Sequence, residues 1–210
     1  MKMPKYTPEV PMGLLLFIAL MAAAIIFLGA AKTETEAQLG KEVPGFELVD
    51  HEGNTVSLAD YEGKVLVLEW INPDCPFVKR HYGLGTMKDL AEKYQEQDVV
   101  WLAVNSTHYM NQETNKKWAE KYELPYPILM DADGSVGRMY GAKTTPHMYI
   151  IDSTGKLVYQ GGIDTQAAAR GPLKDDTVNL VAQALDEVLA EKEVSQSQSK
   201  PYGCSVKYKK

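Results

Sequence analysis

The chain has 210 residues, of which 45% are hydrophobic, enough for one ordinary domain with a packed core and additional segments. Its formal net charge of -6 argues against nucleic acid as a partner, because phosphate binding requires clustered Lys and Arg side chains. The two cysteines, Cys75 and Cys204, are too few for a disulfide-stapled scaffold, and the lack of a C-x-x-C motif excludes a zinc ribbon. The open choices are a reactive thiol, a single bridge or two inert cysteines.

The first predicted element is a membrane segment at residues 12–31. This stretch carries no charge and is about as long as a helix needs to cross the hydrocarbon core of a bilayer. Lys2 and Lys5, in the short N-terminus at 1–11, favour a cytoplasmic location for that end. The segment is either an uncleaved anchor or a cleaved secretion signal. The sequence therefore predicts an extracytoplasmic domain, anchored on the periplasmic or cell-surface side of a membrane, or secreted if the segment is cleaved.

A polar linker at 32–40 precedes the predicted folded domain at 41–190. The domain opens with a hairpin, whose strands near 46–49 and 55–58 flank a turn-rich stretch. The run at 65–70 is apolar except for one residue, which is typical of a central strand buried on both faces. The linker thus leads into a sheet-forming region.

Helices and strands then alternate to the end of the domain. The pattern predicts a helix from Cys75 to about residue 97, bent near Gly83 and Gly85. Strands and helices follow at 99–104, 111–122, 127–130, 136–140, 148–151, 157–159 and 176–190. The last helix is amphipathic, with one apolar face formed by Val178, Val181, Leu185, Val188 and Leu189.

This order predicts an α/β fold with a mixed central sheet flanked by helices. The alternating part implies parallel crossovers, whereas the last two strands, joined by a tight turn, form an antiparallel pair. Residues 191–210 are low in hydrophobicity and are predicted to be a flexible C-terminal tail that carries Cys204.

Cys75 is the strongest candidate for a functional residue. It directly follows a buried strand and precedes Pro76, a residue suited to the first turn of a helix. Free N–H groups and the dipole at a helix N-terminus stabilise a thiolate and so lower the pKa of a cysteine. Lys79 and Arg80 add positive potential one turn further on. The alternative is a buried cysteine that packs as a small hydrophobic residue.

Several motifs resemble the alkyl hydroperoxide reductase/thiol-specific antioxidant (redoxin) family, and within it the peroxiredoxin-like branch. The segment W-I-N-P-D-C-P-F-V at 70–78 is similar to the active-site turn of thioredoxin-like proteins. The segment T-T-P-H-M at 144–148 is similar to their second signature, whose proline is cis and lies against the reactive cysteine. The opening at 46–64 and the end P-Y-G-C-S-V-K-Y at 201–208 also match. The resemblance implies a thioredoxin-like fold with an N-terminal hairpin extension and thiol oxidoreductase or antioxidant chemistry.

The resemblance also implies roles for individual residues. Cys75 would be the nucleophile, and Cys204 is the candidate resolving thiol, because Val78 stands where a thiol–disulfide reductase has its second cysteine. Asn72 and Pro146 stand where a true peroxiredoxin has Thr or Ser and its arginine, which leaves Arg80 or Arg138 as the candidate arginine. The expected lining of the active site is Trp70, Asn72, Pro76, Arg80, Thr145, Pro146 and His147.

The predicted substrate is a peroxide or a disulfide, reduced with electrons from a thiol donor, and no cofactor or metal is expected. One alternative is a membrane-tethered thiol–disulfide exchange protein that acts on other proteins. Another is a non-enzymatic metal-binding module, because Cys75, His147 and Cys204 are soft ligands suited to copper(I) or zinc. A third is a non-catalytic interaction domain, which a buried and unreactive Cys75 would favour.

Overall fold

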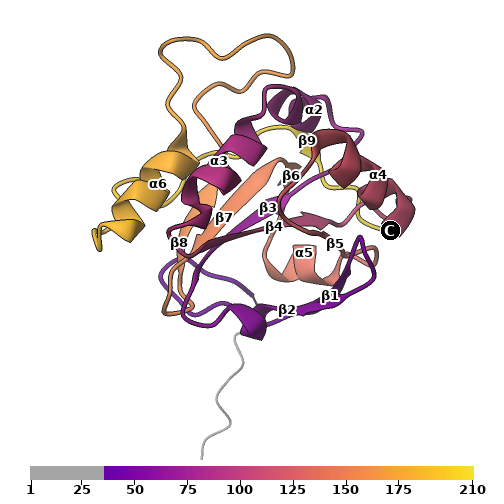
Figure 1. Ribbon diagram of the computed structural model, residues 1–210, viewed down its shortest axis with the longest axis horizontal. Coiled ribbons are helices and arrows are strands. Elements are labelled where there is room, and N and C mark those ends of the chain that lie inside the picture. The colour runs from indigo at the N-terminus through magenta and orange to yellow at the C-terminus, as the bar shows by residue number, and fades with distance from the viewer. Residues whose placement is uncertain (1–35) are drawn as a thin grey trace, which may run out of the picture. The chain divides into compact units, whose positions relative to one another are not determined.

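The computed structural model describes residues 36–210, which form a mixed seven-stranded sheet with helices on both faces (Figure 1). The strand order is β2-β1-β5-β4-β3-β7-β8. β3 runs parallel to β4 and antiparallel to β7, and the N-terminal pair β1 and β2 is antiparallel. The predicted mixed sheet and hairpin are therefore confirmed. The strands are β1 (Glu47–Asp50), β2 (Thr55–Ser57), β3 (Val65–Trp70), β4 (Val99–Asn105), β5 (Ile128–Met130), β7 (His147–Ile151) and β8 (Leu157–Gly161).

The helices divide between the two faces of this sheet (Figure 1). The face whose core cluster contains Cys75 is covered by α2 (Pro76–Gly83), α3 (Thr86–Gln95), α4 (Gln112–Tyr122) and α6 (Leu180–Leu189). The other face carries α5 (Ser135–Met139) and the 3-10 turn η1 (Leu58–Tyr61). All six residues of β3 are buried, as expected for a strand covered on both sides.

The helix after Cys75 is interrupted where its glycines predict a bend. α2 ends at Gly83 and α3 begins at Thr86. Between them Gly85 has a φ of +75°, a left-handed conformation that glycine adopts without strain. The break lets both helices pack on one face of the sheet, where α2 buries Val78 and α3 buries Met87.

The last helix is shorter than the sequence pattern predicts. It begins at Leu180 because the side chain of Asn179 accepts a hydrogen bond from the N–H three residues on and so caps the helix. Val178 therefore lies in the preceding loop, is 46% exposed and does not belong to the apolar face. The other predicted members of that face are buried or pack against the core: Val181, Leu185, Val188 and Leu189.

The segment expected to be a flexible C-terminal tail is instead packed against the domain. Within it, β9 (Cys204–Ser205) pairs antiparallel with β6 (Thr144–Thr145) in a second, two-stranded sheet. Gln198 forms a bridge with Gln160 of β8, and the Val206 N–H donates to a carbonyl just before β6. Backbone hydrogen bonds hold this segment together with a few apolar contacts, and its low overall hydrophobicity therefore does not indicate flexibility.

Packing also begins earlier than the linker prediction at 32–40 implies. The Ala37 N–H donates to the Met139 carbonyl, and the Gly40 N–H donates to the Leu157 carbonyl. The predicted membrane segment at 12–31 and the N-terminus before it lie outside the described residues. Among the helices of residues 36–210, none combines the length and the apolar character needed to cross a membrane.

A carboxyl group is buried in the central strand. Glu69 of β3 is inaccessible to solvent, and its Oε2 accepts a hydrogen bond from the Trp101 indole N–H at 3.0 Å. Burial raises the pKa of Glu69 to about 8, although hydrogen bonds from Trp101 and Tyr82 favour the ionised form. Glu69 is therefore largely protonated at neutral pH.

We expect Glu69→Gln to reduce the pH dependence of stability. Folded Glu69 stays protonated up to about pH 8, whereas in the unfolded chain its carboxyl ionises near the ordinary value of 4.5. Between these values the folded state binds more protons, so this group lowers the free energy of unfolding as pH rises, by about 1.4 kcal/mol per pH unit. Glutamine does not titrate, so the variant loses this contribution.

Denaturant unfolding at a series of pH values from 4.5 to 8 measures the difference between wild type and variant. The control is Glu62→Gln, which removes an exposed carboxyl group. If the free energy of unfolding changed with pH in the same way in wild type and in Glu69→Gln, Glu69 would not bind the extra proton in the folded state.

Candidate active site

Cys75 lies just beyond β3, where a tight turn leads into α2. The Cys75 N–H donates to the Asn72 carbonyl at 2.9 Å, and the Asn72 side-chain oxygen accepts from the Asp74 N–H at 2.8 Å. Pro76 follows as the first residue of α2. Asn72 and Pro76 therefore shape the turn that presents Cys75, whose side chain is only 1% exposed.

The second predicted motif faces this turn. The Thr145–Pro146 peptide bond is cis, and Thr145 is fully buried. The thiol of Cys75 donates to the Thr145 carbonyl oxygen at 2.9 Å across a separation of 70 residues in sequence. The structure thus brings Cys75, Thr145 and Pro146 together.

β9 brings the second cysteine to the same place. Cys204 is the direct antiparallel partner of Thr145, the residue whose carbonyl oxygen accepts from Cys75. Gly203 permits this approach, because a Cβ at its position would lie 2.0 Å from the Thr145 carbonyl oxygen and its φ is +129°. Both cysteines are free thiols.

The two thiols have opposite pKa shifts. Burial raises the pKa of Cys75, but hydrogen bonds outweigh burial and hold it below that of an ordinary thiol. These bonds come from the side-chain hydroxyl of Thr145, from the Val78 N–H in the first turn of α2, and from the backbone and thiol of Cys204. The contact with the Thr145 carbonyl oxygen is a separate one, in which the protonated thiol is the donor. Burial, followed by the hydrogen bond and charge of Cys75, raises the pKa of Cys204 to about 11. Cys75 is therefore the thiol that ionises first, and the thiolate is the nucleophilic form.

Tyr202 fixes the segment that carries Cys204. Its hydroxyl donates to Asp164 Oδ1 at 2.5 Å, and because a hydroxyl has one proton, His81 Nε2–H donates to Tyr202 at 2.9 Å. Burial lowers the pKa of His81 to about 4, so the ring is neutral at pH 7. His81 belongs to α2, the helix that follows Cys75. The network therefore ties the C-terminal segment to that helix.

Three residues of this region are missing from the set predicted from the sequence: Glu69, Asp164 and Gly203. A glutamate within an otherwise apolar strand and a glycine directly before a cysteine are the two signals that the sequence contains. Nothing in its sequence context distinguishes Asp164 from a surface aspartate.

Two predicted lining residues lie on the other face of the sheet. Trp70 belongs to the core cluster that does not contain Cys75, and its indole N–H donates to Ser106. His147 is the β-partner of Trp70, and its Nδ1 lies 3.0 Å from the Tyr149 hydroxyl. Burial lowers the pKa of His147 to about 4. Neither residue forms a hydrogen bond with Cys75. Trp70 and His147 were expected to line the active site, but they pack in the core on the other face of the sheet.

The arginines expected to assist peroxide chemistry are engaged elsewhere. Arg80 is 6% exposed, and its Nε and Nη2 donate to the carbonyls of residues 171–172 at 2.9 and 3.1 Å. The guanidinium of Arg138 stacks over the Tyr208 ring at 4.3 Å and donates to a carbonyl near the C-terminus. In the part of the chain that the structure describes, no hydrogen bond joins either arginine to Cys75.

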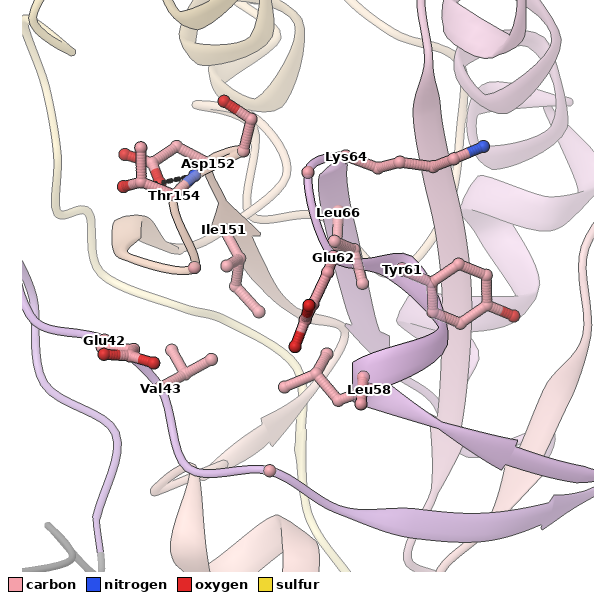
Figure 2. Close-up of a pocket in the computed structure, with 15 residues that line it drawn as sticks. Glu42, Val43, Leu58, Tyr61, Glu62, Lys64, Leu66, Ile151, Asp152 and Thr154 are labelled. Atoms are coloured by element: carbon pink, nitrogen blue, oxygen red, sulfur yellow. Dashed lines mark hydrogen bonds between the residues drawn. The ribbon is translucent and has the colours of Figure 1, made fainter.

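A hollow of about 420 Å³ lies elsewhere on the domain (Figure 2). Figure 2 shows carboxylates of Glu42, Glu62 and Asp152 around an apolar floor that includes Leu58 and Ile151. It is lined by none of the predicted site residues.

The structure offers no support for the metal-binding alternative. Nowhere in residues 36–210 do three or more His, Cys, Asp or Glu side chains gather so that they could hold a metal ion. Cys75 and Cys204 meet at β6, whereas His147 lies beside Trp70 on the other side of the sheet. The three proposed ligands therefore do not form one group.

We expect Tyr202→Phe to weaken the pairing of the two cysteines. The variant keeps the ring but removes the hydroxyl that links Asp164 and His81. Breaking a buried hydrogen-bond network costs about 1–3 kcal/mol, so the equilibrium constant for forming a Cys75–Cys204 disulfide against a glutathione buffer should fall about tenfold. Peptide mapping of acid-quenched samples measures the fraction oxidised.

The matched control is Tyr208→Phe. Tyr208 lies four residues beyond Cys204 and donates its hydroxyl to the Ala142 carbonyl at 2.8 Å, so it also anchors the C-terminal segment. We expect a smaller effect there, because β9 and Tyr202 still hold Cys204. Equal shifts in the two variants would mean that Tyr202 has no special role in positioning the thiol.

The chain is similar to proteins of known name and to solved structures. It is 33% identical over 145 residues to the thiol-disulfide oxidoreductase ResA of Geobacillus thermodenitrificans, covering 69% of this chain and 80% of that protein. ResA of Bacillus cereus is 27% identical over 150 residues, covering 70% and 83%. The structure of an uncharacterized conserved protein from Geobacillus kaustophilus aligns with a TM-score of 0.74 and 35% identity, covering 82% of this chain and 93% of that one. A hypothetical protein from Sinorhizobium meliloti aligns with a TM-score of 0.75 and 30% identity, covering 83% and 96%.

The match to a family covers more than half of the chain. Residues 39–160 match the AhpC/TSA family, a span that includes Cys75 and the cis proline but ends before Cys204. The resemblance found in the sequence motifs is thereby confirmed. The protein is an oxidoreductase with a thioredoxin-like fold, and the chain belongs to the AhpC/TSA family.

Proposed function

We propose that the protein exchanges disulfides through Cys75 as the attacking thiolate and Cys204 as the resolving thiol. The observation that carries this proposal is the position of Thr145, whose carbonyl oxygen accepts from Cys75 and whose β-partner is Cys204. The relatives named thiol-disulfide oxidoreductase ResA support the same reaction class.

The reaction consists of two exchange steps. The Cys75 thiolate attacks one sulfur of a substrate disulfide, forms a mixed disulfide and releases the other sulfur as a thiolate. Cys204 then loses its proton and attacks the sulfur of Cys75, forming the Cys75–Cys204 disulfide and releasing the second substrate thiolate. Two protein thiols are oxidised, one substrate disulfide is reduced, and the two protons pass to the released thiolates. A thiol donor reverses these steps to regenerate the protein.

The residues around Cys75 favour a disulfide over a peroxide as the substrate. Peroxide reduction requires side-chain donors that polarise the O–O bond, and the two candidate arginines bind backbone carbonyls instead. A disulfide needs less assistance, because a thiolate is a good leaving group.

The test uses fully reduced protein and hydroxyethyl disulfide, a small neutral substrate. Wild type should form the Cys75–Cys204 disulfide, and Cys204→Ser should stop at a mixed disulfide on Cys75. The rate for Cys204→Ser should rise with pH through a pKa below that of a free cysteine, about 8.5, because the hydrogen bonds to Cys75 stabilise its thiolate. Quenched-flow mass spectrometry follows each species.

Cys75→Ser is the matched control, and it should form little mixed disulfide at neutral pH, because burial, the largest cause of the raised pKa of Cys204, persists in this variant. Faster modification at Cys204 than at Cys75 would refute the assignment of roles. In a second experiment, the reduced protein reacts with hydrogen peroxide at the same concentration as the disulfide. Oxidation of Cys75 by peroxide at a rate far above that by the disulfide would make the protein a thiol peroxidase instead.

We also propose that residues 12–31 anchor this domain to a membrane, with the domain on the extracytoplasmic side. The support is the uncharged apolar stretch itself and the lysines before it. The full-length protein should remain in the membrane fraction after carbonate washing, and protease added outside should reach the domain. Recovery of soluble protein whose N-terminus lies just after this stretch would establish a cleaved signal.

A further inference from the structure

A basic hollow adjoins the candidate active site. It has a volume of about 590 Å³ and is lined by residues of the turn at Cys75, of α2 and of the loop between β8 and α6. Asp74 and Pro76, the two neighbours of Cys75 in sequence, both line it. Its cationic lining residues are Lys79, Arg80 and Arg170, against the single carboxylate of Asp74.

The loop at 165–179, which projects beside α2 in Figure 1, supplies one wall of this hollow. Arg80 holds the loop in place by donating to the carbonyls of residues 171–172, next to Arg170. Arg80 is itself 6% exposed, so this wall is fixed by a buried side chain rather than by a surface contact. Contacts within the fold therefore define the shape of the hollow.

The positive charge of the hollow is not neutralised within the protein. Among the residues that the structure describes, Lys79, Arg80 and Arg170 form no ion pair with any carboxylate. Arg80 is met only by neutral carbonyl oxygens, and its Nη1 has no hydrogen-bond partner in residues 36–210. Cations that gather in a concave site attract an anionic ligand, because the low-dielectric walls focus their field.

We propose that this hollow binds a carboxylate of the substrate and that the preferred substrates are small disulfides that carry carboxylate groups. The inference rests on the function proposed above and names the substrate class for the same site. The volume suits a ligand of that size. A carboxylate held by Lys79 and Arg170 keeps the substrate next to the Cys75 turn.

Binding of a carboxylate in this hollow leaves the two disulfide-exchange steps unchanged. Cys75 displaces one carboxylate-bearing thiolate and Cys204 displaces the second, so the two protein thiols are oxidised as the substrate disulfide is reduced to two thiols. Overall the protein carries a net charge of -6, which repels anions at long range. A preference for an anionic disulfide therefore requires a local cationic site such as this one.

The experiment compares three disulfides against the reduced full-length protein: oxidised glutathione (anionic), hydroxyethyl disulfide (neutral) and cystamine (cationic). Each rate of protein thiol oxidation is divided by the rate of the same disulfide with free dithiothreitol, which removes differences in intrinsic reactivity. Wild type should favour oxidised glutathione over cystamine. Lys79→Gln/Arg170→Gln should lower the ratio of the glutathione rate to the neutral rate about threefold or more, since each exposed charge contributes modestly.

Lys174→Gln is the matched control, because Lys174 is exposed on the same loop but does not line the hollow. It should leave the ratios close to those of wild type. If the double variant and the control had the same ratio of the glutathione rate to the neutral rate, the anion site would be refuted. Oxidation of the protein by the neutral disulfide would still support the proposed function. If none of the three disulfides oxidised Cys75, both proposals would fail.

Discussion

The pairing of β9 with β6 is the constraint on which the candidate active site depends. β6 is joined to β7, and the register of β7 against β3 sets where Thr145 lies relative to the turn that follows β3. The central sheet therefore fixes the Cys75–Thr145 contact before the C-terminal segment takes part. β9 adds Cys204 by pairing with the same residue, so one backbone position orients both thiols.

Directional polar contacts hold the C-terminal segment, together with a few apolar side chains that pack against the two core clusters, among them Val194 and Val206. Tyr202 links Asp164 to His81, and all three side chains lie in or at the edge of the protein core. Buried polar groups cost free energy unless they are paired, so the bonds from Tyr202 and His81 favour this arrangement over one in which those groups are buried without partners. This accounts for the defined position of a segment that has little hydrophobic surface of its own. Gly203 adds a steric condition, because its lack of a side chain lets β9 reach Thr145.

The sequence predicts those features that follow from local patterns. The apolar run of β3, the glycines that separate α2 from α3 and the Pro76 start of α2 are signals of this kind, and the structure agrees with them. The Thr145–Pro146 motif also marks the contact with Cys75. Each of these depends on a few neighbouring residues.

Features set by distant contacts do not show in the sequence pattern. Trp70 and His147 belong to the two motifs, but strand alternation turns them to the opposite face from Cys75. Arg80 is close to Cys75 in sequence, yet it binds carbonyls some ninety positions further on. The docking of residues 191–210 rests on partners at 81, 142, 160 and 164, which composition does not reveal.

The separation of the two cysteines in sequence has a consequence for the whole domain. A bond between Cys75 and Cys204 would close a loop of about 130 residues, which restricts the unfolded chain enough to stabilise the native state by about 5 kcal/mol in the chain-entropy model. That loop encloses four of the seven strands of the central sheet, β4, β5, β7 and β8. By the thermodynamic cycle, folding favours formation of the bond by the same amount. Each catalytic turnover would then switch the domain between a less stable and a more stable form, so that its resistance to heat reports its oxidation state.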